Sequence, residues 1–270
     1  MKRATLLVMI GSPSSEVYEK FKDKVPVEFA NEYQFNGAQL ALPLEPDSQD
    51  LYDAIQFAES RGGHPQLFSK VAYTKKEMEN WPWYVPVLPC PLELEGTHPV
   101  DYGTKYEDGC PHCGLGSTPV GDVYVNRRFI KKRRMGNLAP GFFVSKDVKE
   151  ILEEHKLTGI SFDRRLRDYK GREFDEYYIM TIHNVLPPLS KTTLLKPGGL
   201  INETCAHRIT YLQSDLQYES EKLADALDFN LTQEYLNNWK EQYIVLSARA
   251  RQILRKNRVF VHYYTPVALL

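Results

Sequence analysis

Hydrophobic positions along this chain follow two different periods, which predicts both strands and helices. The apolar, β-branched run over 4–10 ends at a Gly-Ser-Pro turn and is typical of a buried strand. Leu51, Ile55 and Ala58 instead recur at the spacing of one helix face. The first ninety residues are therefore predicted to form a strand over 4–10, helices over 14–24 and 48–60, a short helix that begins at the capping box Thr74-x-x-Glu77, and an irregular or extended proline-rich segment over 81–91.

The remainder of the chain shows the same mixture and a weak internal repeat. Ser145 and Ser247 each follow a short apolar strand, and each precedes a helix with an Ile-Leu pair six and seven residues later. The pattern indicates a duplicated strand–helix–strand unit or the chance agreement of two common buried patterns. With no regular βαβ period and no glycine-rich phosphate loop, the predicted fold class is α+β, with mixed sheets and flanking helices. Further strands are predicted over 122–125, from 160, over 177–183 and over 258–264.

Size and composition describe an ordinary globular protein. The 270 residues carry 34 Lys+Arg against 35 Asp+Glu, a net charge of −1, and 42% are apolar. A general nucleic-acid coat protein would be strongly basic, and no apolar run approaches the roughly 18 residues of a membrane-spanning helix. The start of the chain also matches a signal peptide, but it lacks a small-x-small cleavage site, which favours the buried strand. We expect an N-terminal α+β part over 1–100 and a second part over 101–270, with related halves over 101–200 and 201–270.

The most specific local signal is the loop Cys110-Pro-His-Cys113-Gly. Two thiolates separated by two residues can bind one zinc ion at about 2.3 Å each, and the following glycine lets backbone amides approach the sulfurs. Zinc needs two more ligands, which Cys205 and His207 can supply from a second loop, with the proline-flanked Cys90 as a reserve. The sequence thus predicts a zinc-ribbon-like loop and a structural zinc site that joins the middle of the chain to its C-terminal part.

Two other interpretations of these cysteines remain open. A redox pair usually begins a helix after a strand, whereas this pair follows Asp108-Gly109 in a loop. The thiols can also be unligated, because one Cys-x-x-Cys has no second pair to match it. For catalysis, the chain has no His-Glu-x-x-His, His-x-Glu or Gly-x-Ser-x-Gly pattern. We therefore expect a protein that is not an enzyme and has no catalytic residues.

A basic run is the other feature with chemical potential. Six cations within eight residues can bind phosphates or an acidic protein surface. The alternative is a solvated loop or an edge strand whose lysines prevent pairing with other strands. As a partner-binding site it would comprise Arg127, Arg128, Lys131, Lys132, Arg133 and Arg134.

The cysteine loop and its surroundings resemble the double-CxxCG motif proteins of bacteria, a family that includes immunity proteins of polymorphic, contact-delivered toxin systems. The resemblance extends over residues 65–270. In this family the metal ligands are paired cysteines, which here correspond to Cys110 and Cys113. The second pair is reduced to Cys205, since Arg208 stands where its partner would be, and His207 is a chemically suitable substitute. The resemblance rests on Tyr102-Gly103-Thr104-x-Tyr106, Cys110-Pro-His-Cys113-Gly114-x-Gly116, Phe143-Val144-Ser145, Leu157-Thr158-Gly159-Ile160-x-Phe162 and Tyr264-Thr265-Pro266-Val267.

The resemblance implies a cytoplasmic protein that binds and neutralises a cognate toxin. The 17 tyrosines and 12 phenylalanines of the chain agree with a partner-binding surface, since aromatic residues are enriched at protein interfaces. We expect a non-enzymatic, immunity-like binding protein with a structural zinc ion and a protein partner. The alternative is a nucleic-acid-associated zinc-ribbon protein that uses the basic run over 127–134.

Overall fold

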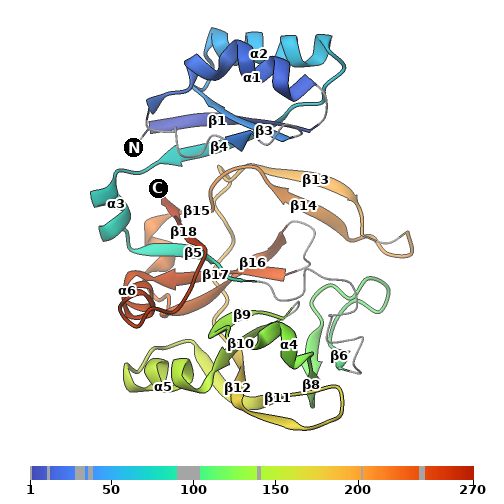
Figure 1. The fold of residues 1–270 in the computed structure, drawn as a ribbon, viewed down its shortest axis with the longest axis vertical. Coiled ribbons are helices and arrows are strands. Elements are labelled where there is room, and N and C mark those ends of the chain that lie inside the picture. The colour runs from blue at the N-terminus through green and yellow to red at the C-terminus, as the bar shows by residue number, and fades with distance from the viewer. Residues whose placement is uncertain are drawn as a thin grey trace. The chain divides into compact units, whose positions relative to one another are not determined.

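A computed structural model describes residues 2–10, 13–27, 34–35, 39–89, 104–138, 141–201, 203–236 and 241–270 (Figure 1). These residues form two compact units. The first comprises Met1–Asn80 with Thr193–Leu195 and Gln213–Asp215, and the second comprises Trp81–Thr192, Lys196–Leu212 and Leu216–Leu270. The division expected near residue 100 falls in a segment, 90–103, that lies outside the described residues.

The first unit is a four-stranded antiparallel sheet with helices. Its strand order is β2-β3-β1-β4, and β1 pairs with both β3 and β4. Alternate residues of β1, such as Leu7 and Met9, pack with the apolar faces of the helices in one buried cluster. The elements are β1 (Lys2–Ile10), α1 (Pro13–Phe21), the 3₁₀ turn Lys22–Lys24, β2 (Gln34–Phe35), β3 (Gln39–Leu44), α2 (Gln49–Ser60), β4 (Gln66–Ala72) and α3 (Lys75–Asn80).

Two of the three predicted helix starts in this unit are confirmed by their caps. The Ser48 hydroxyl accepts a hydrogen bond from the Leu51 N–H at 3.2 Å at the start of α2. At the start of α3, the Thr74 N–H donates to Glu77 Oε2 at 2.8 Å, and the Glu77 N–H donates to Thr74 Oγ1 at 3.2 Å. This reciprocal pair is the capping box that the sequence predicts.

The second unit contains two larger sheets, with strand orders β8-β11-β12-β10-β9 and β16-β17-β5-β18, and several two-stranded pairs. Together with the helices they confirm the predicted α+β class. The elements are β5 (Trp83–Val87), β6 (Lys105–Glu107), β7 (Thr118–Val120), β8 (Val123–Tyr124), α4 (Arg127–Ile130), β9 (Met135–Asn137), β10 (Phe142–Ser145), α5 (Lys146–Glu154), β11 (Ile160–Arg167), β12 (Glu173–Ile182), β13 (Leu195–Leu200), β14 (Arg208–Leu212), β15 (Gln217–Tyr218), the 3₁₀ turn Ser220–Leu223, β16 (Phe229–Leu236), β17 (Glu241–Ser247), α6 (Ala248–Lys256), β18 (Tyr263–Pro266) and β19 (Ala268–Leu269).

The proline-rich segment over 81–91 is expected to be irregular or extended and to hold no regular element. It is extended over Trp83–Val87, but the second part is wrong, because β5 lies inside the second sheet between β17 and β18. Proline is tolerated in β5 for a local reason. Pairing with β17 involves only Trp83 and Tyr84, so Pro86 lies beyond it and its missing N–H removes no bond on that side. On the other side Pro86 stands opposite Tyr264 of β18.

The two sheets contain the same arrangement of strand, helix and strand. β10 and β11 both run antiparallel to β12, so they are parallel to each other, and α5 connects them. β17 and β18 flank β5 in the same way, with α6 as the connection. β9 pairs with β10 on the outside, as β16 does with β17. In Figure 1, α5 and α6 lie one above the other, each beside its own sheet. We call these segments the first repeat (135–167) and the second repeat (229–266).

The two repeats agree in detail at a constant offset of 102 positions. Ser145 and Ser247 are the N-caps of helices of nine residues each. After each helix, a residue with positive φ turns the chain inward, Lys156 at 49° and Arg258 at 55°. The strand predicted over 258–264 is therefore wrong in its first half: Val259 turns back into the core, and β18 begins at Tyr263.

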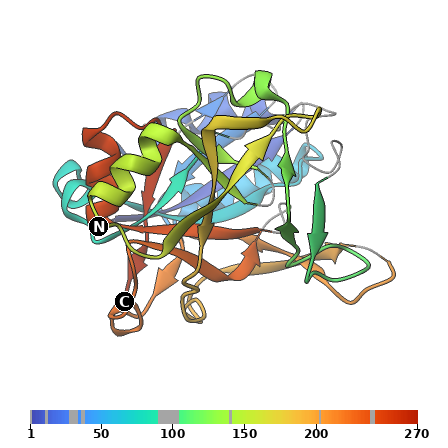
Figure 2. The ribbon, with the colours of Figure 1, turned by 90° about the horizontal axis from the view of Figure 1, so that it is seen from below.

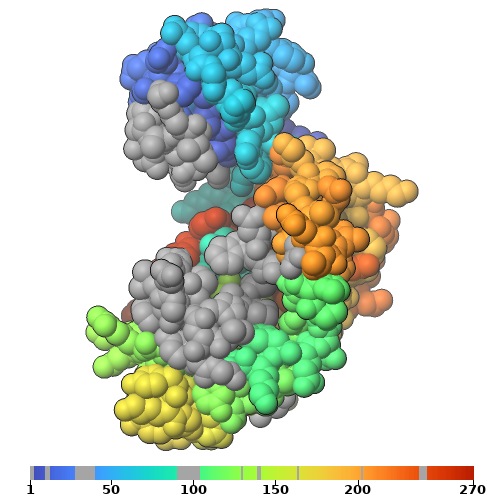
Figure 3. All heavy atoms as spheres, turned by 90° about the vertical axis from the view of Figure 1, so that its right-hand side faces the viewer, coloured from blue at the N-terminus to red at the C-terminus, as the bar shows by residue number. Residues whose placement is uncertain are grey.

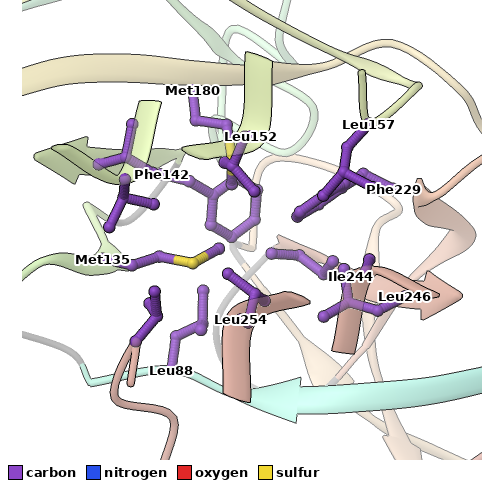
Figure 4. Close-up of a cluster of buried hydrophobic side chains, with 14 of the residues drawn as sticks. Leu88, Met135, Phe142, Leu152, Leu157, Met180, Phe229, Ile244, Leu246 and Leu254 are labelled. Atoms are coloured by element: carbon purple, nitrogen blue, oxygen red, sulfur yellow. The ribbon is translucent and has the colours of Figure 1, made fainter. Parts of the chain in front are cut away.

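The helices and sheets of both repeats share one hydrophobic core. Figure 4 shows side chains from the two sheets and from α5 and α6 pointing toward one another. Leu152 of α5 and Leu254 of α6 occupy equivalent positions, and neither side chain is exposed to solvent. The second unit is thus held together at its centre by residues that the repeat places in pairs.

Candidate metal centre

The Cys-x-x-Cys loop is the tip of a short β-hairpin. Strands β6 and β7 pair in antiparallel register from Lys105 opposite Val120 to Glu107 opposite Thr118. Between them the chain closes on itself, because the Cys110 N–H donates to Leu115 O at 2.9 Å and the Gly114 N–H donates to Cys110 O at 2.8 Å. These bonds turn both cysteine side chains to the same end of the hairpin.

Two glycines allow this tight loop. Gly114 has a φ of +71°, a conformation that costs a residue with a side chain about 1–2 kcal/mol. Gly109 has a different constraint, since a Cβ there would lie 2.0 Å from Ser117 Oγ and 2.8 Å from Ser117 N. The loop sequence is therefore set by backbone geometry on both sides of the cysteines.

Backbone N–H groups prepare the first sulfur for a cation. Those of Cys113 and His112 donate to the Cys110 thiolate and lower the pKa of the Cys110 thiol to about 6. Burial raises the pKa of the Cys113 thiol instead. N–H groups directed at sulfur are typical of thiolates that bind metal, because each bond stabilises the charged form.

The second pair of candidate ligands lies on another hairpin. Strands β13 and β14 pair with each other, and residues 201–207 connect them. The Ile201 N–H donates to His207 O at 2.9 Å and closes this loop. Figures 1 and 2 show the ends of the two hairpins side by side, and in Figure 3 the orange atoms of β13 and β14 adjoin the green atoms of the β6–β7 hairpin.

The four predicted ligands meet where the hairpin tips meet. The sulfurs of Cys110, Cys113 and Cys205 and a ring nitrogen of His207 all lie within 4.8 Å of one another. The Cys113 Sγ and His207 Nδ1 atoms are 3.4 Å apart. Around a tetrahedral zinc ion with bonds of about 2.3 Å to sulfur and 2.0–2.1 Å to nitrogen, neighbouring ligand atoms are about 3.6–3.8 Å apart. The four ligand atoms could therefore bind one shared metal ion if the more distant of them moved slightly closer together.

Burial of the site decreases from the cysteines toward the histidine. Cys113 is buried, Cys110 and Cys205 are half-buried, and His207 is exposed. With four protein ligands, the group can complete a tetrahedral coordination shell without water. Cys90, the predicted reserve ligand, lies outside the described residues. Within the described part of the chain the four residues come together as the sequence predicts, and they can bind a metal ion.

The basic run over 127–134 is the other candidate binding feature of the sequence. It folds into the helical turn α4 and the bend after it, and Ile130 in its middle is fully buried. Arg127 pairs with Glu176 at 2.5 Å, and Arg134 pairs with Asp147 at 2.5 Å. The two ends of the run are thus paired with carboxylates of the protein, and the run is not the edge strand that was one alternative.

A second polar cluster, which the sequence pattern does not single out, surrounds Arg251 of α6. This arginine is only 6% exposed and lies against the rings of Tyr84 and Tyr264. The internal repeat is the sequence signal that points to Arg251. Lys149 occupies the equivalent position of the first repeat and also lies against two aromatic rings.

No known family model matches the chain, and no curated protein is significantly similar to it. Among the described residues, no helix is both long and apolar enough to span a membrane. Function is therefore inferred from the chemistry of the site itself.

Proposed function

We propose that this chain binds one zinc ion through Cys110, Cys113, Cys205 and His207, and that the ion is structural. The observation that carries the proposal is the convergence of these four donors from two separate hairpins to within 4.8 Å. Three thiolates and one imidazole form a soft donor set that suits zinc. Four protein ligands leave no coordination position for a water or a substrate, which is the arrangement of structural rather than catalytic zinc.

The metal would supply stability that the hairpins lack. Each hairpin has only two strands, and an isolated two-stranded hairpin is marginally stable in water. The paired segment of β6 and β7 is three residues long, and most of its positions are exposed or half-buried. Zinc bound at the tips would hold both hairpins together by coordinate bonds, so that the free energy of metal binding contributes to folding.

Elemental analysis of the purified protein tests this proposal. We expect about one zinc per chain in the wild type, loss of zinc in Cys110→Ser, and weaker zinc binding in His207→Ala. His112→Ala is the matched control, since His112 lies between the two cysteines but is not one of the four clustered ligands. Wild-type protein without stoichiometric metal after expression in zinc-supplemented medium would contradict the proposal.

We propose further that the protein acts by binding a protein partner, as an immunity protein that neutralises a cognate toxin. Support comes from the resemblance of the Cys-x-x-Cys-Gly region to the double-CxxCG proteins. Exposed aromatic side chains, among them Tyr169, Phe260 and Tyr263, provide the type of residue that is enriched at protein interfaces. In this role the zinc site maintains the fold, and recognition belongs to the surface.

Co-expression with the product of the neighbouring gene tests the immunity role. We expect the two proteins to co-purify, and we expect this chain to restore growth to cells that the neighbouring product inhibits. If neither occurs, the immunity role is wrong, whereas the zinc proposal is decided by the metal content alone.

A further inference from the structure

Arg251 is a buried cation whose surroundings are aromatic. Its guanidinium carbon lies 4.3 Å from the ring centre of Tyr84 and 5.4 Å from that of Tyr264. One terminal nitrogen, Nη1, donates to the Tyr84 hydroxyl at 3.3 Å. The two rings come from strands β5 and β18, which lie beside each other in the second sheet. Their faces stabilise the positive charge but do not neutralise it.

Part of this cluster is left without hydrogen bonds. The Nε atom of Arg251 and the hydroxyl of Tyr264 are shielded from solvent, and neither has a partner in the protein. A buried polar group without a partner destabilises a fold, and the effect is larger when the group is charged. Among the described residues, no carboxylate forms an ion pair with Arg251 or with the neighbouring cations Arg255, Lys256 and Arg258.

The electrostatic surroundings of the two tyrosines are positive. Burial raises the pKa of Tyr264 to about 12, and the charges of Arg251 and Arg255 oppose this shift. The same two arginines oppose the rise in the pKa of Tyr84 that burial causes. Arg255 follows Arg251 by one helical turn, so both cations act on the same pair of hydroxyls.

The first repeat also places a cation against two aromatic rings, but there the cation has an anionic partner. Lys149, which is equivalent to Arg251, lies 5.8 Å from the ring centre of Phe162 and 5.3 Å from that of Tyr178. Phe162 is the equivalent of Tyr264 at the same offset, and Tyr178 lies on the central strand β12 as Tyr84 does on β5. Lys149 Nζ is paired with Glu153 Oε2 at 2.5 Å.

The second repeat has reversed the charge at the position of that anion. The residue equivalent to Glu153 is Arg255, so the carboxylate that neutralises the cation in the first repeat is replaced by a second cation. An arginine also stands in place of the lysine, and guanidinium groups bind carboxylate and phosphate oxygens through paired, parallel hydrogen bonds. The second repeat therefore lacks an anion at a place where the first repeat has one.

We infer that Arg251, Arg255 and the hydroxyls of Tyr84 and Tyr264 form a binding site for an oxyanion, a carboxylate or phosphate group carried by a ligand from outside the chain. The ligand takes the place that Glu153 occupies in the first repeat. Arg251 supplies the buried charge, Arg255 a second charge, and the Tyr264 hydroxyl a free donor. The inference depends on the repeat and not on the metal centre.

Thermal unfolding of the full chain, with zinc present, tests the inference. Sodium phosphate is the phosphate probe, N-acetyl-aspartate is the carboxylate probe, and sodium chloride at equal ionic strength is the reference. A ligand that binds only the folded state raises the unfolding temperature, and we expect a saturable rise of several degrees with at least one probe. Lys131→Gln/Lys132→Gln, which removes two charges from the basic run, should respond as the wild type does.

Two variants locate the response. Arg255→Glu restores the carboxylate of the first repeat, so we expect a higher unfolding temperature without added anion and an affinity for the probe at least tenfold weaker. Arg251→Met should abolish the response. If Arg251→Met fails to fold, Arg255→Glu still decides the question, because it retains the buried arginine.

Each outcome has a defined meaning. A response to phosphate alone or to N-acetyl-aspartate alone supports the site and identifies the source of the oxyanion. No response above that to sodium chloride overturns the inference, as does an undiminished response in Arg255→Glu. A folded Cys110→Ser protein should keep the response, which separates this result from the fate of the zinc proposal.

Discussion

A zinc ion bound between the two hairpins would act as a cross-link. Removing one of its ligands should therefore make the free energy of unfolding insensitive to a chelator. The proposed ion would join Cys113 and Cys205, which close a loop of about 90 residues. Cross-linking a loop of that length lowers the entropy of the unfolded chain by the equivalent of about 4.6 kcal/mol. Metal that stays bound to fewer ligands in the unfolded chain reduces this figure, so it is an upper value. Cys205→Ser leaves two thiolates and one imidazole, a set that we expect to lose the ion, so the link between the hairpins is broken while the first loop stays intact.

Urea unfolding, followed by circular dichroism with and without a chelator, measures this contribution. We expect EDTA to destabilise the wild type by roughly 2–4.6 kcal/mol and Cys205→Ser by less than about 1 kcal/mol, so that the two perturbations are far from additive. His112→Ala should behave as the wild type does. An equal effect of EDTA on the wild type and on Cys205→Ser, or no effect on either, would refute the cross-link.

Three further predictions address the core, the loop and the pH response. Leu152→Ala and Leu254→Ala should each lower the free energy of unfolding by about 3 kcal/mol. Because both side chains are buried in one core, both variants should shift the same cooperative urea transition. Shifts of two separate transitions would contradict this. Gly114→Ala should weaken zinc affinity about tenfold, because the φ of +71° at Gly114 disfavours a residue with a side chain. Competition with a chromophoric chelator measures this affinity, and an unchanged value would show that the loop does not need this conformation. The pKa of Glu219 is lowered from 4.5 to about 2 by the Lys222 ammonium, a backbone N–H and the Ser190 hydroxyl. The contribution of Glu219 to stability is therefore complete above pH 4.5 and is lost as pH falls toward 2. Glu219→Gln should make the free energy of unfolding less dependent on pH in this range, and identical pH profiles for the two proteins would contradict this.

Local signals were sufficient for most helices and for half of the metal centre. Ser48 and Thr74 predict helix starts because a cap is formed by residues close in sequence. The spacing of Cys110 and Cys113 likewise predicts a metal-binding loop, since both ligands belong to one turn. In these places the sequence within a few residues determines the conformation, so no knowledge of the tertiary fold is needed.

Features that depend on distant pairing were harder to predict. Pro86 indicates an irregular segment until β17 and β18, more than 150 residues later, provide the neighbours that make β5 a strand. The pairing of Cys205 and His207 with the first loop was a chemical expectation from ligand type, and the structure brings them together through the β13–β14 hairpin. Tertiary context overrides local propensity at both places.

Arg251 illustrates a third case, in which the residue type itself misleads. An arginine on a helix with several other cations is typical of a solvated surface, whereas here its side chain is buried between two rings. Only the repeated pattern relates it to Lys149, whose partner Glu153 is replaced by Arg255 in the second repeat. Comparing the two segments therefore gave information that composition and spacing did not.

X-ray absorption at the zinc K edge identifies and counts the atoms that bind the ion. We expect three sulfurs at about 2.3 Å and one nitrogen at about 2.0–2.1 Å in the wild type. In His207→Ala the nitrogen should be lost while the three sulfurs remain. A fourth sulfur in place of the nitrogen, or a shell dominated by oxygen, would contradict the claim that Cys110, Cys113, Cys205 and His207 bind the ion together.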